Sequence, residues 1–228
     1  MASSVIFEER VEVPYFHSLA DFRAWTLSDE FPEHGRIDYL DGRIEVDMSP
    51  ENLFSHGTIK TEVVRALANI VRAADSGYLF SDRTRVSCPE ADLSAEPDVV
   101  YLSAEAIDSD RVRLVPGAGG EPESYVELEG APDLVVEIVS DSSVAKDTKR
   151  LPVSYWRAGI AEYWLIDVRG ERQFFRIHAR GAGAYDPAPI DADGFQASAI
   201  FGHCFRLDRR RDARGLRVFD LQSRLRGG

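Results

Sequence analysis

The sequence has few cysteines, no long hydrophobic run and no repeated or low-complexity segment. Its two cysteines, Cys88 and Cys204, lie far apart, and no CxxC motif or Cys/His cluster has the spacing of zinc ligands. No run approaches the ~18 apolar residues of a membrane helix, and residues 1–10 have neither the basic flank nor the hydrophobic region of a secretory leader. These absences predict two ordinary thiols in a cytoplasmic protein that does not enter a membrane.

The chain also lacks net positive charge, since 27 basic residues face 39 acidic ones, for a formal net charge of -12. This balance counts against binding of nucleic acid by bulk electrostatic attraction. The C-terminal segment is an exception because of its arginines, which are Arg206, Arg209, Arg210, Arg211, Arg214, Arg217, Arg224 and Arg226. The sequence leaves two interpretations of this segment open, a solvated and partly frayed tail or a source of phosphate contacts.

Length and hydrophobic patterning indicate the fold class. With 228 residues and 44% hydrophobic content, the chain can bury a sizeable core. We predict a single domain over 1–228, with a core at about 36–180 and a basic C-terminal extension at about 203–228. Hairpins followed by a strand, a helix and a strand predict an α/β (α+β) protein with a mixed β-sheet flanked by helices.

Periodicity, capping residues and turn residues locate the expected elements. The expected elements are, in chain order, a helix at 18–26, a hairpin with arms at 36–40 and 43–48, a helix at 53–74, strands at 78–86 and 98–102 around a polar loop at 88–96, a loop at 116–122, a strand at 134–139, a helix from 146 or 147 to 158, and strands at 162–167 and 173–177.

Two of the apolar strands carry a carboxylate. Asp98 stands directly before one strand, and Glu137 lies within the run 134–139. A carboxylate among apolar residues has a desolvation cost unless it is hydrogen-bonded, paired or metal-bound, so this pattern predicts a hard-cation site. Together with an ammonium such as Lys146 or Lys149, two carboxylates form the group that metal-dependent phosphodiester cleavage requires. Each acid taken singly is also typical of a turn or a cap, and that alternative stays open.

Five segments in this order are RIDYLDG at 36–42, Ser49-Pro50 with His56, PDVV at 97–100, PDLVVEIVS at 132–140 and AGIAEYWLID at 158–167. Over roughly residues 15–225 they resemble the Uma-two family of restriction endonucleases, which belongs to the PD-(D/E)XK nuclease superfamily. The resemblance implies a restriction-endonuclease-like core with an N-terminal β-hairpin. It also implies an Asp, an Asp or Glu and a Lys around one or two divalent cations.

The resemblance assigns roles to individual residues. Asp98 matches the family's first metal-binding aspartate and Glu137 its second acid, and the carbonyl of Ile138 is implied as a further metal ligand. Asp38 matches an acid of the N-terminal hairpin. His56 matches the histidine that opens the long helix, where it would contact substrate or a metal-bound water.

Two of these assignments have plainer alternatives. His56 is equally typical of a histidine at a helix N-terminus that bonds to the backbone. Asp38 is equally typical of a hairpin acid that pairs with Arg36 or Arg43.

The chain departs from the superfamily pattern at the lysine. The position two residues after the second acid is Val139, and Leu151 fills the family's usual helix position four residues after Asp147. Lys146 and Lys149 are the remaining candidates. We favour Lys146, because it would lie near the end of the strand, whereas Lys149 would lie about 200° round an α-helix from position 151.

The resemblance implies a Mg²⁺-dependent endodeoxyribonuclease, with Mn²⁺ as the other candidate metal and DNA as the substrate. One alternative is a catalytically silent nuclease fold that serves as a binding or assembly module, because the lysine is displaced and the chain is acidic. Another is an enzyme acting on a small phosphorylated or carboxylated substrate. A homodimer is a further expectation, with Tyr155-Trp156 and Phe174-Phe175 either at the interface or in the core.

Overall fold

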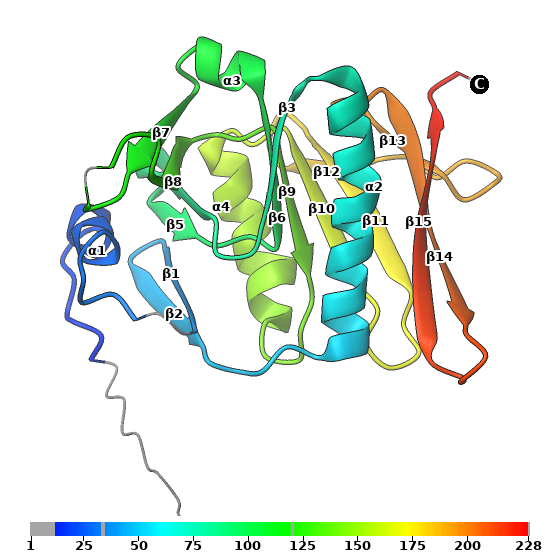
Figure 1. The fold of residues 1–228 in the computed structure, drawn as a ribbon, viewed down its shortest axis with the longest axis horizontal. Coiled ribbons are helices and arrows are strands. Elements are labelled where there is room, and N and C mark those ends of the chain that lie inside the picture. The colour runs from blue at the N-terminus through cyan, green and yellow to red at the C-terminus, as the bar shows by residue number, and fades with distance from the viewer. Residues whose placement is uncertain (1–11, 33–34, 120, 228) are drawn as a thin grey trace, which may run out of the picture.

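A computed structural model of the chain describes residues 12–32, 35–119 and 121–227 (Figure 1). The prediction that rests on residues 1–10 lies outside the described residues. The helical elements are α1 (Leu19–Thr26), the π turn η1 (Leu53–Gly57), α2 (Thr58–Ala74), the 3₁₀ turn η2 (Pro89–Ala91), α3 (Ala104–Asp108), the π turn η3 (Lys146–Arg150) and α4 (Leu151–Ala158). The strands are β1 (Arg36–Leu40), β2 (Arg43–Asp47), β3 (Gly77–Ser81), β4 (Arg85–Cys88), β5 (Leu93–Ala95), β6 (Val99–Ser103), β7 (Val112–Pro116), β8 (Tyr125–Gly130), β9 (Leu134–Ile138), β10 (Glu162–Asp167), β11 (Phe174–Arg180), β12 (Tyr185–Pro187), β13 (Gln196–Ser198), β14 (His203–Arg211) and β15 (Arg217–Leu225).

The central sheet is mixed and lies between two helices. Its order is β12-β11-β10-β9-β6-β3, and β9 runs parallel to β10 because α4 connects them as a crossover. Residues alternate between its faces, so that Val99 packs with α2 while Val100 packs with α4. Figure 1 shows these two helices on opposite sides of the strands. The predicted α+β class with a mixed sheet flanked by helices is therefore confirmed.

A second sheet, in the order β2-β1-β5-β4-β8-β7, carries the predicted N-terminal hairpin. Its β1–β2 register places Leu40 opposite Arg43 around Asp41-Gly42, and both turn residues have positive φ, as this hairpin turn requires. Helix α1 covers the sheet by packing Phe22 against Tyr39. The chain passes from β5 to β6, and so from the second sheet to the central one, through residues 96–98.

The C-terminal segment forms a third sheet, in the order β13-β14-β15, that packs on α2. Phe205 and Leu221 belong to the same buried cluster as the apolar stripe of that helix, and the Leu221 N–H donates to Glu62 on α2 at 2.8 Å. The frayed-tail interpretation is therefore wrong. Several arginines of this C-terminal segment pair with acids, as Arg224 does with Asp191 at 2.6 Å.

Two other predictions need correction. The expected strand 78–86 is two strands in different sheets, β3 and β4, because the chain turns at Asp82 and Arg83, both with positive φ. The expected loop 88–96 contains η2 and β5. The stretch 78–86 has the composition of a single strand, and β5 in the stretch 88–96 is too short and polar to be recognised as a strand. The sequence pattern alone therefore does not reveal the change of sheet.

Two of the four aromatic residues considered for a dimer interface are core residues. Tyr155 and Phe175 are buried, whereas Phe174 is exposed and Trp156 lies under the guanidinium of Arg180. The homodimer stays a prediction. Among the described residues, no helix has both the length and the apolar character needed to cross a membrane.

The burial of β14 generates a stability prediction. Phe205→Ala should lower the free energy of unfolding by about 3–5 kcal/mol, because a fully buried aromatic ring is lost from the core beside α2. Leu225→Ala, at an exposed end of the same hairpin, should change it by less than about 0.5 kcal/mol. Urea unfolding measures both free energies. If Phe205→Ala lowered the free energy of unfolding as little as Leu225→Ala does, the hairpin would not contribute to the core.

Candidate active site

The site is built where the second sheet joins the central one. Asp98 directly precedes β6, and the antiparallel register pairs Val99 with Val136 on β9. The next position of that register places Asp98 opposite Glu137, so that their side chains lie on the same face. Neither residue has exposed surface. Two carboxylates from neighbouring strands are thus held together in the interior.

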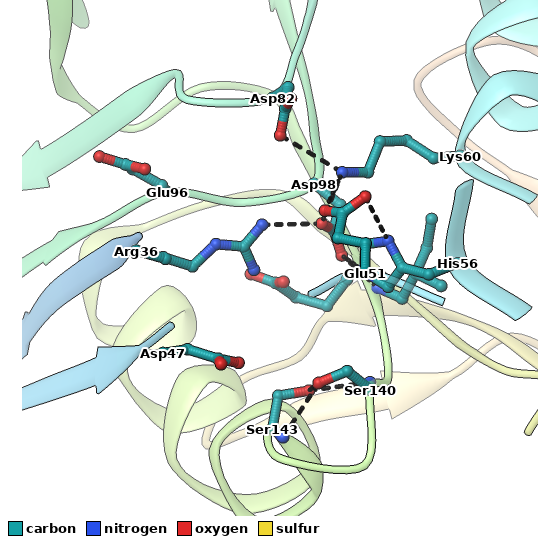
Figure 2. Close-up of polar contacts among 12 residues, drawn as sticks. Arg36, Asp47, Glu51, His56, Lys60, Asp82, Glu96, Asp98, Ser140 and Ser143 are labelled. Carbon is teal, nitrogen blue, oxygen red and sulfur yellow. Dashed lines mark hydrogen bonds and ion pairs between the residues drawn. The ribbon is translucent and has the colours of Figure 1, made fainter. Parts of the chain in front are cut away.

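Asp98 is surrounded by donors from several elements. The amide of Ile138 donates to its Oδ2 at 2.7 Å, and Arg36 Nη2 on β1 donates to its Oδ1 at 2.9 Å. On the other side, His56 Nε2 lies 3.4 Å from Oδ2 and Lys60 Nζ 3.5 Å from Oδ1. Figure 2 shows these three basic side chains pointing toward the carboxylate. Burial alone would raise the pKa of Asp98, but Arg36, His56 and Lys60 hold it well below its usual range.

Glu137 has the opposite environment. Burial raises its pKa well above the usual range, and the nearby charges of Asp147 and Asp98 raise it further. The Tyr155 hydroxyl donates to Oε1 at 2.5 Å, while Oε2 is buried and has no hydrogen-bond partner. One oxygen of this buried carboxylate therefore remains available.

Lys146 lies beside these acids. Its ammonium is buried and donates to Asp38 Oδ2 at 2.7 Å, while Asp38 Oδ1 accepts the Glu96 amide at 3.0 Å. Burial lowers the pKa of Lys146, but the charges of Asp38 and Glu137 outweigh it and raise the pKa above its ordinary value. Asp38 thus pairs with Lys146 rather than with Arg36 or Arg43. Lys149 is exposed, and the geometry therefore favours Lys146 of the two candidates.

Asp147 is a third buried acid in this group. Burial raises its pKa to about 6, against the opposing effects of Lys146 and of a hydrogen bond from the Ser143 hydroxyl. The sequence shows Asp147 beside Lys146 but gives no reason to expect it inside.

The two helices that supply the site both begin with a π turn instead of the expected α-helix. His56 lies in η1, where Asn52 accepts backbone amides and so caps the turn. Lys146 and Asp147 lie in η3, whose i→i+5 bond runs from the Leu151 amide to the Lys146 carbonyl. Turns of this kind are rare in proteins, and those that occur are often found at functional sites.

Sequence reasoning missed Lys60 and Glu51. The chain has only three lysines, and two of them are buried at this site. Lys60 stands four residues after His56 and so shares its helix face, which is the signal that could have found it. Its ammonium donates to Glu51 at 2.7 Å, and His56 Nδ1 lies 3.3 Å from the same carboxylate. The His56 ring thus faces Asp98 and Glu51 rather than the backbone.

A cleft of about 250 Å³ opens beside these residues. Its lining residues are Gly35, Arg36, Asp47, Ser49, Pro50, Glu51, His56, Asp82, Arg83, Glu96, Ser140, Ser142 and Ser143. A smaller recess of about 60 Å³, lined in part by Asp38 and Lys146, shares Asp47 and Ser143 with the cleft. The cleft thus lies against Arg36 and His56, two of the side chains around Asp98, and the recess lies against Lys146.

Comparison with protein families supports the resemblance seen in the sequence. The profile of Uma2, described as "Putative restriction endonuclease", matches residues 19–208. The chain belongs to the Uma2 family. A solved structure from Anabaena variabilis, titled as a putative nuclease belonging to DUF820, is similar in fold, with a TM-score of 0.59 and 22% identity over 81% of this chain and 90% of that one. No curated protein matches the chain.

The residues of this Uma2 site fit a divalent cation. Single atoms of Glu51, His56 and Asp98 lie within 4.8 Å of one another, a spacing at which they could share an ion. Two buried atoms of the site have no hydrogen-bond partner, namely Glu137 Oε2 and His56 Nδ1, the latter 3.3 Å from Glu51 but without hydrogen-bond geometry. Carboxylate oxygens suit Mg²⁺ and Mn²⁺, and an imidazole nitrogen suits transition metals. The role of the Ile138 carbonyl as a further metal ligand stays a prediction.

The buried Lys146–Asp38 pair generates a second prediction. Lys146→Met should lower the free energy of unfolding by about 3 kcal/mol or more, because Asp38 is left as a buried charge without its partner. Lys149→Met, in the same turn but exposed, should change it by less than about 0.5 kcal/mol. Adding Asp38→Asn to Lys146→Met should cost less than the sum of the single changes, and strictly additive effects in chemical denaturation would contradict the pairing.

Proposed function

We propose that the protein is a divalent-metal-dependent endonuclease that hydrolyses phosphodiester bonds of DNA. The observation that carries this proposal is the pair of buried acids, Asp98 and Glu137, that face each other beside the buried ammonium of Lys146. Membership of a family described as "Putative restriction endonuclease" supports DNA as the substrate. Apolar strands retain such a group at a high desolvation cost, which favours a role in chemistry over one in stability.

Asp98 and Glu137, with the carbonyl of Ile138, are the residues we assign to the metal, and Mg²⁺ or Mn²⁺ is the ion. A bound divalent cation polarises the phosphate and lowers the pKa of a bound water. Arg36 and Lys60 keep Asp98 ionised, and Tyr155 fixes one oxygen of Glu137 while the other stays available. Asp98 is thus held in the ionised form that a hard cation requires, whereas Glu137, whose pKa is raised, would lose its proton when the cation binds.

Lys146 is the residue we assign to the attacking water. Its ammonium is anchored by Asp38 and lines the recess that shares Asp47, Ser142 and Ser143 with the cleft, where it can donate a hydrogen bond and offset negative charge. Asp38 positions it and keeps it protonated. His56 lies between Asp98 and Glu51 and is assigned to hold substrate or a metal-bound water.

A silent binding module remains the second candidate because one observation favours it. Three basic side chains already surround Asp98, so a cation must compete with them for its oxygens. In such a module the basic groups would serve in place of a metal, and the fold would persist without cleavage.

A cleavage assay tests the proposed function. The wild-type protein should nick supercoiled DNA in Mg²⁺ or Mn²⁺, while Asp98→Asn, Glu137→Gln and Lys146→Met should each lower the rate at least about 100-fold, because each removes a ligand or a charge that the reaction needs. Lys149→Met should retain the wild-type rate. Gel analysis of nicked and linear products gives the rates.

Metal binding measured by calorimetry separates the candidates. Binding that depends on Asp98 and Glu137 without cleavage of any DNA would favour the silent module. Cleavage that persists in Asp98→Asn and Glu137→Gln would show that the site lies elsewhere. Circular dichroism of each variant checks that it folds.

A further inference from the structure

Arg83 is a cleft residue that the fold leaves unused. Its side chain is exposed and lines the active-site cleft, and within residues 12–32, 35–119 and 121–227 we find no hydrogen bond or ion pair to its guanidinium. The other cations around the site are committed, since Arg36 and Lys60 neutralise Asp98 and Lys146 is bound to Asp38. The charge of Arg83 lowers the pKa of the cleft acid Glu96, which burial raises, but without a hydrogen bond or an ion pair to the described residues its guanidinium remains available to a ligand.

The sheet register places Arg83 next to the site. Strand β3 pairs with β6 so that Ser81 lies opposite Val99, and the Asp82 amide continues the ladder by donating to the Asp98 carbonyl at 3.2 Å. Arg83 follows directly. The turn that carries it is thus fixed to the backbone of the central acid, which makes its position relative to the site well defined.

The backbone at this turn is unfavourable for the residues that occupy it. Asp82 and Arg83 have φ of 60° and 53°, the left-handed region in which a side chain with Cβ has a free-energy cost. Glycine would occupy both positions without that cost. The backbone conformation therefore does not by itself favour an arginine at position 83.

The electrostatics of the cleft indicate what that role is. Four acids line it, namely Asp47, Glu51, Asp82 and Glu96, in a chain whose net charge is -12. A phosphate that approaches such a surface is repelled unless a cation offsets the acids. Guanidinium groups suit this task because they donate two parallel hydrogen bonds to phosphate oxygens.

We propose that Arg83 binds a phosphate of the substrate strand at the mouth of the cleft, next to the bond that is cut. The proposal rests on the proposed function and deepens it by naming the residue that draws a polyanionic strand into an acidic cleft. Because phosphate contacts position a strand without reading bases, Arg83 should contribute affinity and not sequence preference.

The test is DNA binding by Arg83→Gln, Arg83→Lys and Arg83→Gly, with Arg72→Gln as the control. Arg72 is also exposed, but it lies in the last turn of α2, at the end opposite His56. Fluorescence anisotropy with a labelled duplex in Ca²⁺ should show about tenfold weaker binding for the Gln and Gly variants and a salt slope shallower by about 0.9. Arg83→Lys should keep the slope, and Arg72→Gln should bind within about twofold of wild type.

The urea midpoint distinguishes this role from a structural one. Arg83→Gly should unfold at the same or a higher urea concentration than wild type while it binds DNA less well. A lower midpoint with unchanged affinity would overturn the inference. If Arg83→Gln binds like Arg72→Gln while the wild type binds and cuts, the inference fails and the proposed function stands; if the wild type neither binds nor cuts, both fall.

Discussion

The burial of one carboxylate, that of Asp98, is the constraint on which the site depends. An ionised acid with no exposed surface needs compensating donors, because its lost hydration would otherwise outweigh the packing gained. The donors come from β1 through Arg36, from η1 and α2 through His56 and Lys60, and from β9 through the Ile138 amide. The hairpin, the long helix and the central sheet therefore meet at a single side chain. Loss of any one element would leave the carboxylate undercompensated, which ties the geometry of the site to the integrity of the fold.

The surroundings of the two facing acids shift their pKa values in opposite directions. Asp98 lies among cations and stays ionised, whereas Glu137 lies among acids and aromatic hydroxyls, where burial favours its protonated form. Lys146 and Arg36 both lower the pKa of Glu137, but Lys146 is shared with Asp38 and Arg36 with Asp98. A divalent cation would supply the charge that Glu137 lacks. The two acids therefore differ in their partners as well: Glu137 keeps a buried oxygen without a hydrogen bond, whereas Asp98 is paired with cations such as Arg36.

Much of the fold could be predicted because its signals are local. The hairpin around Asp41-Gly42, the apolar stripe of α2 and the buried strands β9 and β10 all follow from turn residues and periodicity. The change of sheet at residues 82–83 could not, because alternation is the same in either sheet and only a long-range partner decides. The C-terminal hairpin could not be predicted because its many arginines suggest solvent exposure. The residues between these arginines are nevertheless buried at alternate positions in the core beside α2. Charge on one face of a strand says little about the other.

Among the site residues, the lysine was the hardest to predict from the sequence. Acids in apolar strands reveal themselves by the cost of their burial, so Asp98 and Glu137 could be proposed from sequence, but the position of a helix lysine depends on the turn that holds it. The usual strand position is Val139, which packs against α4 with Leu151 on the same side of the sheet. The π turn then brings Lys146 toward that side, and the angular argument from ~100° per residue no longer applies through an i→i+5 turn. Apolar packing thus fills the strand position at Val139, and the buried lysine of the site comes from the π turn that opens the helix.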